Sequence, residues 1–344
     1  MAGKIKVAYV GCGAIAERLH IPDMLACADA EIVAFSDPMK AKAEQMRAQF
    51  AENARVYDSH KTMLKAGGID AVVVSTPNIY HGPVAIDCAN AKCHVLVEKP
   101  MATSIAEAKK MIEAAKKNKV QLMVNQCQRL FPAHKKAKEI MDSGIMGRVL
   151  HVTAMFGHEG PEHWSPSGKW FFQKKNARFG AMADLGVHKA DLIRYLTGEE
   201  IVEINAFYET VEKKKTDVED NFVSSLKFSN GAVGTLAASW TVKGAEANYT
   251  VLHCSNGTLQ VCMQPGKPLV AYLHNPSCTI EFELPKTPSN YEGSWGLDVG
   301  NAFIGALLGR AKPYCSGEEG MRSLAVILAA EEAAKTGRTI KIKA

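Results

Sequence analysis

The chain has 344 residues, of which 47% are hydrophobic and 22% are charged, a balance that is typical of globular proteins and excludes a disordered, collagen-like or coiled-coil chain. At roughly 100–200 residues per domain, this length predicts two domains. The net charge of +5 is spread along the sequence, whereas a nucleic-acid-binding protein usually concentrates basic residues on one face, so we expect no nucleic-acid partner.

Strand and helix patterns alternate over roughly the first 125 residues. Short apolar runs predict strands at Lys4–Val10, Glu31–Ser36, Arg55–Tyr57, Asp70–Ser75, His94–Val97 and Val120–Asn125. Segments with helical spacing separate them at Ala14–Ala28, Met39–Phe50, Ser59–Lys65, Pro83–Asn90 and Ser104–Lys117. This alternation is typical of βαβ units and predicts an α/β domain with a doubly wound parallel sheet.

The pattern then changes, which places the domain junction near Asn125–Pro132. The next predicted elements are a helix, a strand, a polar loop and a helix, at Pro132–Ser143, Arg148–Phe156, Gly157–Lys175 and Met182–Leu196. Strand-like segments follow at Val202–Phe207, Asn221–Phe228, Ala232–Trp240, Tyr249–Ser255, Thr258–Met263, Leu269–Leu273 and Thr279–Leu284. Two helices, Gly296–Leu308 and Glu318–Lys335, precede a terminal strand, Thr339–Lys343. The spacing predicts an α+β domain with an antiparallel sheet, so we assign residues 1–126 to the first domain and residues 127–344 to the second.

The nine cysteines are odd in number and include no C-x-x-C pair, which argues against a disulfide framework and a structural zinc site. No apolar run approaches the roughly 18 residues that cross a bilayer, and the N-terminus lacks the apolar region of a signal peptide. We therefore expect a cytoplasmic protein with reduced thiols and no membrane partner.

A G-x-G-x-x-A motif follows the first predicted strand and opens the first predicted helix. Gly11 permits the tight turn, Gly13 lets the backbone approach a pyrophosphate, and the small Ala16 lets the helix pack on the strand. The helix start at Ala14 and Ile15 presents free N–H groups and a partial positive charge to the phosphates. The motif predicts a dinucleotide site, and its position between strand and helix is the context that supports it.

Asp37 ends the second predicted strand, at the distance from the motif expected for a carboxylate that binds the adenosine ribose hydroxyls. A carboxylate repels a 2′-phosphate, so NAD is favoured over NADP. The alternative is that Asp37 only caps the helix that starts near Met39.

Four further segments carry a common pattern: Ser75–His81, Glu98–Pro100, Asn125–Pro132 and Ala183–Asp191. Together with the glycine motif, they resemble the Gfo/Idh/MocA oxidoreductases over essentially the whole chain. The resemblance implies an N-terminal Rossmann domain, a C-terminal domain with a large open sheet, and NAD(P)-dependent oxidation or reduction of sugars, polyols or their derivatives.

The resemblance also implies three catalytic residues, namely Lys99 of E-K-P and Asp184 and His188 of D-x-G-x-H. Asp184 and His188 are spaced i, i+4 and are expected on one helix face. We assign His188 as proton acceptor, Asp184 as the residue that orients it, and Lys99 as the hydrogen-bond donor to the reacting oxygen; alternatively, Lys99 itself is the base. Without the resemblance, a solvated lysine and a helix-surface pair are the simpler interpretations.

Thr76, Pro77, Asn78 and His81 lie at the C-terminal end of a predicted strand, where ligands bind in open α/β sheets. For His81, a contact at the helix N-terminus is the alternative. The expected cofactor contacts are completed by Glu98, Lys99 and Gln126. The resemblance also implies a cis peptide at Pro100.

Substrate contacts are expected at Arg129, His158, Trp164 and Trp170, besides the catalytic residues, because aromatic faces pack on sugar rings. For Arg129, a salt bridge at the domain junction is the alternative. No metal is expected, since the histidines of the 158–163 loop lack the H-E-x-x-H spacing. Residues 178–180 (R-F-G) depart from the three glycines that many family members carry before the aspartate helix, which alters the shape of the substrate site.

The pattern therefore indicates an NAD-dependent dehydrogenase that acts on a secondary hydroxyl of a sugar, glycoside or cyclic polyol. The alternatives are a glycosidase that retains NAD and works by transient oxidation and elimination, and a non-enzymatic sugar sensor. An open sheet with one uncovered face favours association, so we expect a homodimer or homotetramer.

Overall fold

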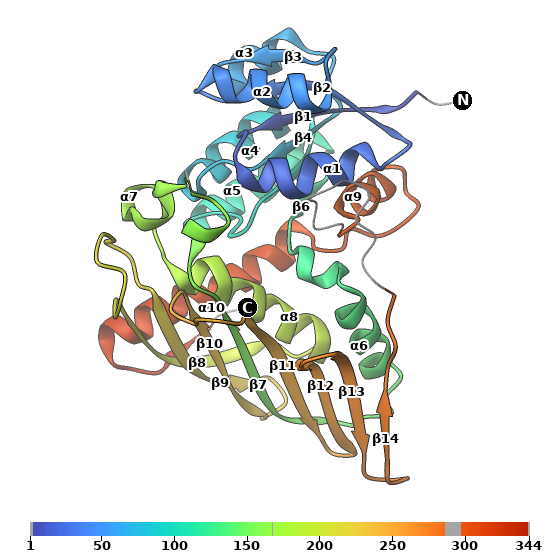
Figure 1. Ribbon diagram of the computed structural model, residues 1–344, viewed down its shortest axis with the longest axis vertical. Helices are drawn as coiled ribbons and strands as arrows, with labels where there is room; N and C mark the ends of the chain where they lie inside the picture. Colours follow the sequence, from blue (N-terminus) through green and yellow to red (C-terminus); the bar gives the residue numbers. More distant parts are fainter. Residues whose placement is uncertain (1–2, 167, 286–296, 343–344) are drawn as a thin grey trace. The chain divides into compact units, whose positions relative to one another are not determined.

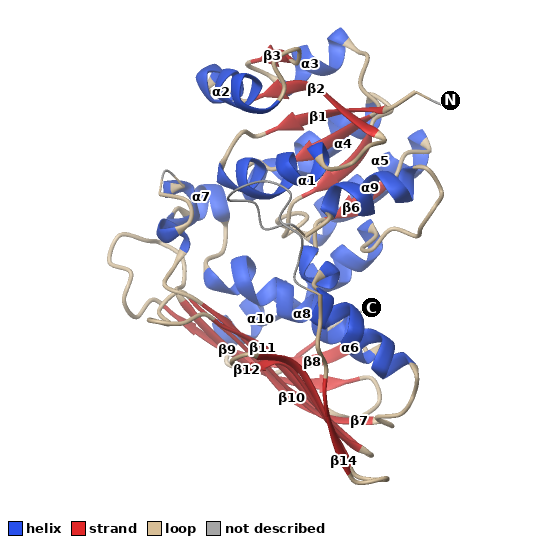
Figure 2. Ribbon diagram, turned by 45° about the vertical axis from the view of Figure 1, so that its right-hand side comes forward, coloured by secondary structure: helices blue, strands red, loops and turns tan. Residues whose placement is uncertain are grey.

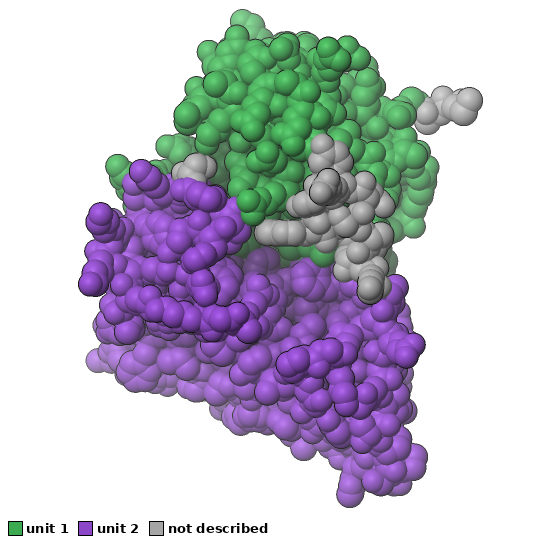
Figure 3. All heavy atoms as spheres, viewed as in Figure 1, with its two compact units in different colours: residues 1–127, 175–177, 287–321 green, residues 128–174, 178–286, 322–344 purple. Residues whose placement is uncertain are grey.

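The computed structural model describes residues 3–166, 168–285 and 297–342, and the chain divides into two compact units (Figure 3). The first unit contains residues 1–127, 175–177 and 287–321, and the second contains residues 128–174, 178–286 and 322–344. Contacts therefore place the main boundary after Cys127 and add a late segment to the first unit, whereas the sequence suggested a single break after residue 126. Gly296 and Lys343, at the ends of two predicted elements, lie outside the described residues.

The first unit is built on a six-stranded sheet in the order β3-β2-β1-β4-β5-β6 (Figure 1). Its strands are β1 (Ile5–Val10), β2 (Ala30–Ser36), β3 (Arg55–Tyr57), β4 (Ala71–Val74), β5 (His94–Val97) and β6 (Leu122–Val124). All neighbouring strands pair in parallel. β4 is buried along its whole length, because helices cover both faces of such a sheet. The predicted doubly wound parallel sheet is confirmed.

Helices of the first unit are α2 (Lys40–Phe50), α3 (His60–Ala66), α4 (His81–Asn90), α5 (Ile105–Asn118) and α9 (Val299–Leu307). The first predicted helix is a π-helical turn (Ala16–His20) that continues into α1 (Ile21–Leu25). Pro22 has no N–H for the usual bond to the preceding turn, which accounts for the wider turn there. The N–H of Val299 donates to Asp23 Oδ2 at 2.9 Å and so ties α9 to α1.

The second unit contains a nine-stranded sheet in the order β14-β13-β12-β11-β7-β10-β9-β8-β15. Its strands are β7 (Val149–Gly157), β8 (Ile201–Glu209), β9 (Asn221–Phe228), β10 (Val233–Ser239), β11 (Ala247–Cys254), β12 (Gly257–Gln264), β13 (Lys267–Leu273), β14 (Cys278–Glu281) and β15 (Ile340–Lys341). Neighbouring strands are antiparallel except β7 and β10, which pair in parallel. The predicted mostly antiparallel open sheet is confirmed, with one parallel pair at its centre.

Helices α6 (Pro132–Asp142), α8 (Val187–Thr197) and α10 (Gly317–Thr336) lie on one face of this sheet (Figure 2). A π-helical turn (Met182–Gly186) leads into α8. The short α7 (Lys174–Ala177) comes earlier in the chain, and its residues 175–177 belong to the first unit. Burial alternates along β9, as expected for a strand with one covered face. Within the described residues, no helix is long and apolar enough to cross a membrane.

Candidate active site

The glycine loop after β1 has the geometry of a phosphate-binding turn. Gly11 adopts a φ of +93°, and a Cβ on it would lie 2.6 Å from the carbonyl oxygen of Ser75, so only glycine fits there. A Cβ on Gly13 would meet no atom within 4 Å. The backbone at Gly13 is therefore open to a ligand, at the start of the first helical segment, as a pyrophosphate requires.

Asp37 holds this loop through backbone N–H groups. Its Oδ2 accepts a hydrogen bond from the N–H of Cys12 at 2.9 Å, and its Oδ1 accepts one from the N–H of Met39 at 2.8 Å. Since each carboxylate oxygen has two acceptor sites, Asp37 keeps capacity for ribose hydroxyls. Its bond to Met39 shows that it also orders the start of α2, so the two interpretations of this residue are compatible.

Two buried polar atoms at the ends of β4 and β6 have no hydrogen-bond partner among the described residues, namely Thr76 Oγ1 and Gln126 Oε1. Buried polar atoms are almost always hydrogen-bonded, so these atoms fit a ligand at this edge of the parallel sheet. Asn78, in contrast, has a hydrogen-bond partner within the protein, because its Nδ2 donates to the carbonyl oxygen of Ala177 at 2.9 Å. Pro77 lies between these residues and has a φ of −58°.

His81 links two loops. Its Nε2 lies 2.8 Å from the carbonyl oxygen of Thr76 and its Nδ1 lies 2.8 Å from that of Pro100. Burial lowers the pKa of His81, and the two carbonyl contacts oppose that effect. The peptide between Lys99 and Pro100 is cis, in agreement with the expectation from the family resemblance. His81 therefore joins the strand-end loop at Thr76 to the loop that presents Lys99.

The carboxylate of Glu98 is held by three hydrogen-bonding partners, one of which is the backbone N–H of Lys99. Its Oε1 lies 2.7 Å from His20 Nε2 and accepts a hydrogen bond from Asn125 Nδ2 at 2.7 Å, and its Oε2 accepts one from the N–H of Lys99 at 3.1 Å. Burial acts to raise the pKa of Glu98, but the hydrogen bonds and charges of His20, Lys99 and Asn125 outweigh it and lower the pKa to about 2. Sequence reasoning missed His20 and Asn125, because nothing local marks them as partners of Glu98.

Asp184 and His188 lie on one continuous helical segment, residues 182–197, which we call the Asp–His helix. Both side chains are buried. Asp184 Oδ2 accepts a 2.9 Å hydrogen bond from the indole Nε1 of Trp240. The ring of His188 lies 5.9 Å from that of Phe156 on β7. The helix thus presents a fixed carboxylate and an imidazole four residues apart, with the carboxylate in the π-helical turn.

Trp240 is the hydrogen-bond donor to Asp184, and the sequence analysis did not single it out. It follows β10 and is fully buried, and its ring contacts Phe172 edge to face at 5.6 Å. A tryptophan at the end of an apolar strand is ordinarily interpreted as core packing. The only signal in the sequence is the indole N–H, which can only donate and therefore requires an acceptor when it is buried.

Arg129 and Asp191 form a buried bidentate salt bridge, with Nε–Oδ2 and Nη2–Oδ1 distances of 2.7 and 2.8 Å. The Arg129 side chain is only 4% exposed and also lies over the ring of Tyr195 at 4.8 Å. Ser323 Oγ donates to Asp191 Oδ1 at 3.0 Å. This is the salt-bridge alternative considered for Arg129, formed inside the second unit.

The aromatic loop after β7 packs on itself. Trp170 stacks on Phe171 at 3.9 Å and Trp164 meets the same ring edge to face at 5.4 Å. His158 contacts the ring of Phe156 at 5.9 Å, the same ring that His188 approaches. In the part of the chain that the structure describes, no group of three or more His, Cys, Asp or Glu side chains could hold a metal ion.

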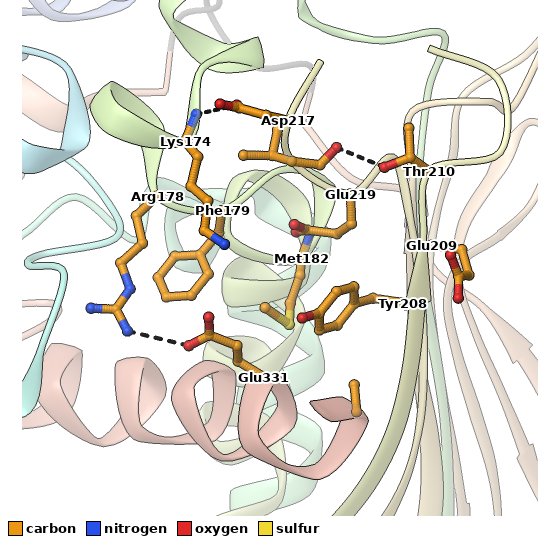
Figure 4. Close-up of a pocket in the computed structure, with 12 residues that line it drawn as sticks. Lys174, Arg178, Phe179, Met182, Tyr208, Glu209, Thr210, Asp217, Glu219 and Glu331 are labelled. Carbon is orange, nitrogen blue, oxygen red and sulfur yellow. Dashed lines mark hydrogen bonds and ion pairs between the residues drawn. The ribbon is translucent and has the colours of Figure 1, made fainter. Parts of the chain in front are cut away.

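Arg178 and Phe179 border a cavity of about 270 Å³ in the second unit (Figure 4). Arg178 adopts a φ of +68°, a strained conformation for a residue with a side chain. Its guanidinium lies over the ring of Phe179 and binds Glu331 Oε2 at 3.2 Å. At Gly180, a Cβ would lie 1.8 Å from the carbonyl oxygen of Glu219. Of the three positions, 180 is the one where the packing demands glycine.

Known proteins of similar sequence and structure show which family the chain resembles. A domain described as "Oxidoreductase family, NAD-binding Rossmann fold" matches residues 5–126, and the "GFO/IDH/MocA C-terminal domain" matches residues 134–260. The 1,5-anhydro-D-fructose reductase of Ensifer adhaerens is 30% identical over 312 residues, which cover 89% of this chain and 90% of that protein. The myo-inositol 2-dehydrogenase of Thermotoga maritima is 26% identical over 355 residues, which cover 98% and 99%. The WlbA dehydrogenase of Bordetella pertussis, solved with NADH and UDP-GlcNAcA, superposes with a TM-score of 0.83 at 26% identity over 99% of both chains.

The glycine loop on a parallel sheet, followed by a second unit with the Asp–His helix, defines a nucleotide-dependent oxidoreductase with a Rossmann domain. Within this class of oxidoreductases, the family is shown by the two matched domains and by the relative at 30% identity. The chain belongs to the Gfo/Idh/MocA family.

Proposed function

We propose that the protein is an NAD-dependent dehydrogenase that oxidises a secondary hydroxyl of a sugar, glycoside or cyclic polyol by reversible hydride transfer. The observation that carries this proposal is the Asp–His helix, whose carboxylate is fixed by a buried indole N–H. The reductase from Ensifer adhaerens and the inositol dehydrogenase from Thermotoga maritima, which act on such compounds by name, support the substrate class.

In the proposed mechanism, His188 accepts the proton of the substrate hydroxyl, and Asp184 orients the imidazole and stabilises its charged form. Lys99 donates a hydrogen bond to the reacting oxygen, which favours the alkoxide and polarises the carbonyl in the reverse direction. NAD, when bound, would supply the hydride acceptor. We favour His188 over Lys99 as the base, because a carboxylate four residues away on the same helix suits the imidazolium that forms.

We propose NAD rather than NADP as the cofactor, with contacts from the glycine loop, Thr76 and Gln126. Asp37 supports this choice because its carboxylate suits the ribose hydroxyls and repels a 2′-phosphate.

The direct test is an absorbance measurement near 340 nm on protein mixed with NAD and pooled polyols, sugars and glycosides, with His188→Ala as the control. We expect a rise beyond one equivalent of NADH in the wild type alone. A transient rise with release of a sugar substituent would contradict net oxidation and indicate the NAD-retaining glycosidase. No change despite bound NAD, across a broad pool, would contradict the enzyme and favour the sensor.

We also propose a homodimer or homotetramer formed through the open face of the nine-stranded sheet. Phe207 on β8 is 74% exposed and pairs across the strands with the exposed Val223 on β9. Val233 on β10 is exposed as well. Apolar side chains on a sheet face that helices leave uncovered favour burial against a second copy. A monodisperse monomer in light scattering at micromolar concentration would contradict this assignment.

A further inference from the structure

Glu219, two residues before β9, binds the start of the Asp–His helix. Its Oε1 accepts hydrogen bonds from the backbone N–H groups of Gly180 at 2.8 Å and Met182 at 3.0 Å. Its backbone carbonyl oxygen accepts a third from the N–H of Ala181 at 3.0 Å. The first N–H groups of a helix have no partner within the helix, so this single residue satisfies three consecutive ones.

The same short segment also supports the residue that holds Asp184. The carbonyl oxygen of Asp220 accepts a hydrogen bond from the backbone N–H of Trp240 at 2.8 Å. The indole of Trp240 in turn binds Asp184. Residues 219 and 220 therefore fix both the beginning of the Asp–His helix and the donor to its carboxylate.

The carboxyl of Glu219 is buried, and Glu219 lines the cavity that Arg178 and Tyr208 also line (Figure 4). Burial raises the pKa of Glu219 to about 7, the hydrogen bonds from Gly180 and Met182 partly oppose that rise, and the charge of Glu331 adds to it. Both charge states are therefore populated near neutral pH.

Charged and titratable groups line this cavity from every element around it. They are Lys174 on α7, Arg178 directly after α7, Tyr208 and Glu209 on β8, Asp217 in the loop between β8 and β9, and Glu331 on α10. Arg178 and Lys335 both bind Glu331, at 3.2 and 2.5 Å. The backbone N–H groups of the helix start are what favours the ionised form of Glu219.

We propose that Glu219 is a positioning residue whose ionised carboxylate holds the start of the Asp–His helix. Protonation of this carboxyl group weakens its hold on the helix start. Catalysis therefore slows as the pH falls. A carboxylate is a stronger acceptor than a carboxylic acid and also complements the positive end of the helix, so protonation weakens both interactions. The slower catalysis at low pH rests on the proposed dehydrogenase function, whereas the weaker hold on the helix start does not depend on it.

The first test measures backbone hydrogen exchange in the peptide that covers residues 179–188, at pH 6 and pH 8, corrected for intrinsic rates. We expect protection in the wild type to fall by about fivefold from pH 8 to pH 6, the size of effect that a lost helix cap produces. In Glu219→Gln, protection is expected to be low at both pH values. Glu209→Gln, which lines the same cavity from β8, is the matched control and should behave as the wild type.

The second test measures kcat/KM against pH with the substrate that the absorbance assay identifies. In the wild type, the loss of ionised Glu219 at low pH adds to the acid limb, so this limb should be steeper in the wild type than in Glu219→Gln. A residue that only stabilises the fold would lower activity at every pH and leave the slope unchanged.

The inference is overturned if protection of residues 179–188 in the wild type is equal at pH 6 and pH 8, or if the scaled profiles of the wild type and Glu219→Gln superimpose. The wild-type exchange experiment decides alone if the variant does not fold. Pronounced pH-dependent exchange without turnover of any sugar or polyol would support the positioning role and contradict the dehydrogenase.

Discussion

The indole N–H of Trp240 donates a 2.9 Å hydrogen bond to Oδ2 of Asp184, and both side chains are buried although they lie 56 positions apart. An indole N–H can only donate and a carboxylate oxygen accepts, so this contact fixes the rotation of the Asp184 carboxylate. The carboxylate predicted to be catalytic therefore depends on a residue that follows a strand of the sheet as well as on its own helix.

Replacing Trp240 with Phe should preserve most of the packing and remove this donor. We expect kcat/KM to fall by about ten- to hundredfold, the usual effect of losing a partner that orients a catalytic group. Steady-state kinetics and thermal unfolding measure the effect. Tyr272→Phe, which also removes a hydrogen bond within the second unit (from Gln264 Nε2 at 2.9 Å), is the control. Equal activity losses in both variants would contradict a specific role for Trp240.

Glu98 should make stability depend on acid pH. The pKa of Glu98 in the folded state, about 2, lies below the ordinary value of 4.5. Its contribution to stability is therefore complete above pH 4.5 and is lost as the pH falls from about 4.5 to about 2. We expect Glu98→Gln to unfold with a free energy lower by up to about 3 kcal/mol at pH 7, and the difference to shrink in this window. Chemical denaturation at several pH values measures it, with exposed Glu113→Gln as control. A difference independent of pH would refute the assignment.

Asp37 should set the preference between NAD and NADP. Asp37→Asn removes the charge but keeps an oxygen that can accept one of the two backbone hydrogen bonds. We expect the ratio of the dissociation constants to move toward NADP by about tenfold, which corresponds to about 1.4 kcal/mol. Calorimetric titration with each nucleotide provides the measurement. If the ratio does not change, the carboxylate serves the loop and α2 alone.

Arg129 should act through stability and not through substrate binding. Arg129→Lys removes the bidentate pairing with buried Asp191, and we expect a loss of about 1–3 kcal/mol in the free energy of unfolding with KM unchanged. Denaturant unfolding and steady-state kinetics separate the two effects, and exposed Arg47→Lys is the matched control. A raised KM at unaltered stability would instead place Arg129 in the substrate site.

The sequence alone determined the order of elements and the candidate chemistry. Alternating apolar strands and helices predicted the parallel sheet, since periodicity is a local property of the chain. The glycine motif could likewise be interpreted from adjacent residues, because a turn at Gly11 and an open backbone at Gly13 are local demands. Lys99, Asp184 and His188 were found through short motifs, and their catalytic roles remain predictions.

Only the tertiary structure decided what holds these residues. His20 reaches Glu98 across 78 positions, Trp240 reaches Asp184 across 56, and Glu219 reaches the helix start across 37 to 39. The parallel pairing of β7 with β10 and the return of α9 to the first unit are also long-range. Such contacts depend on which elements become neighbours in space, whereas periodicity and motif spacing report only on neighbours along the chain. A buried carboxylate requires donors, but the sequence does not say which distant element supplies them.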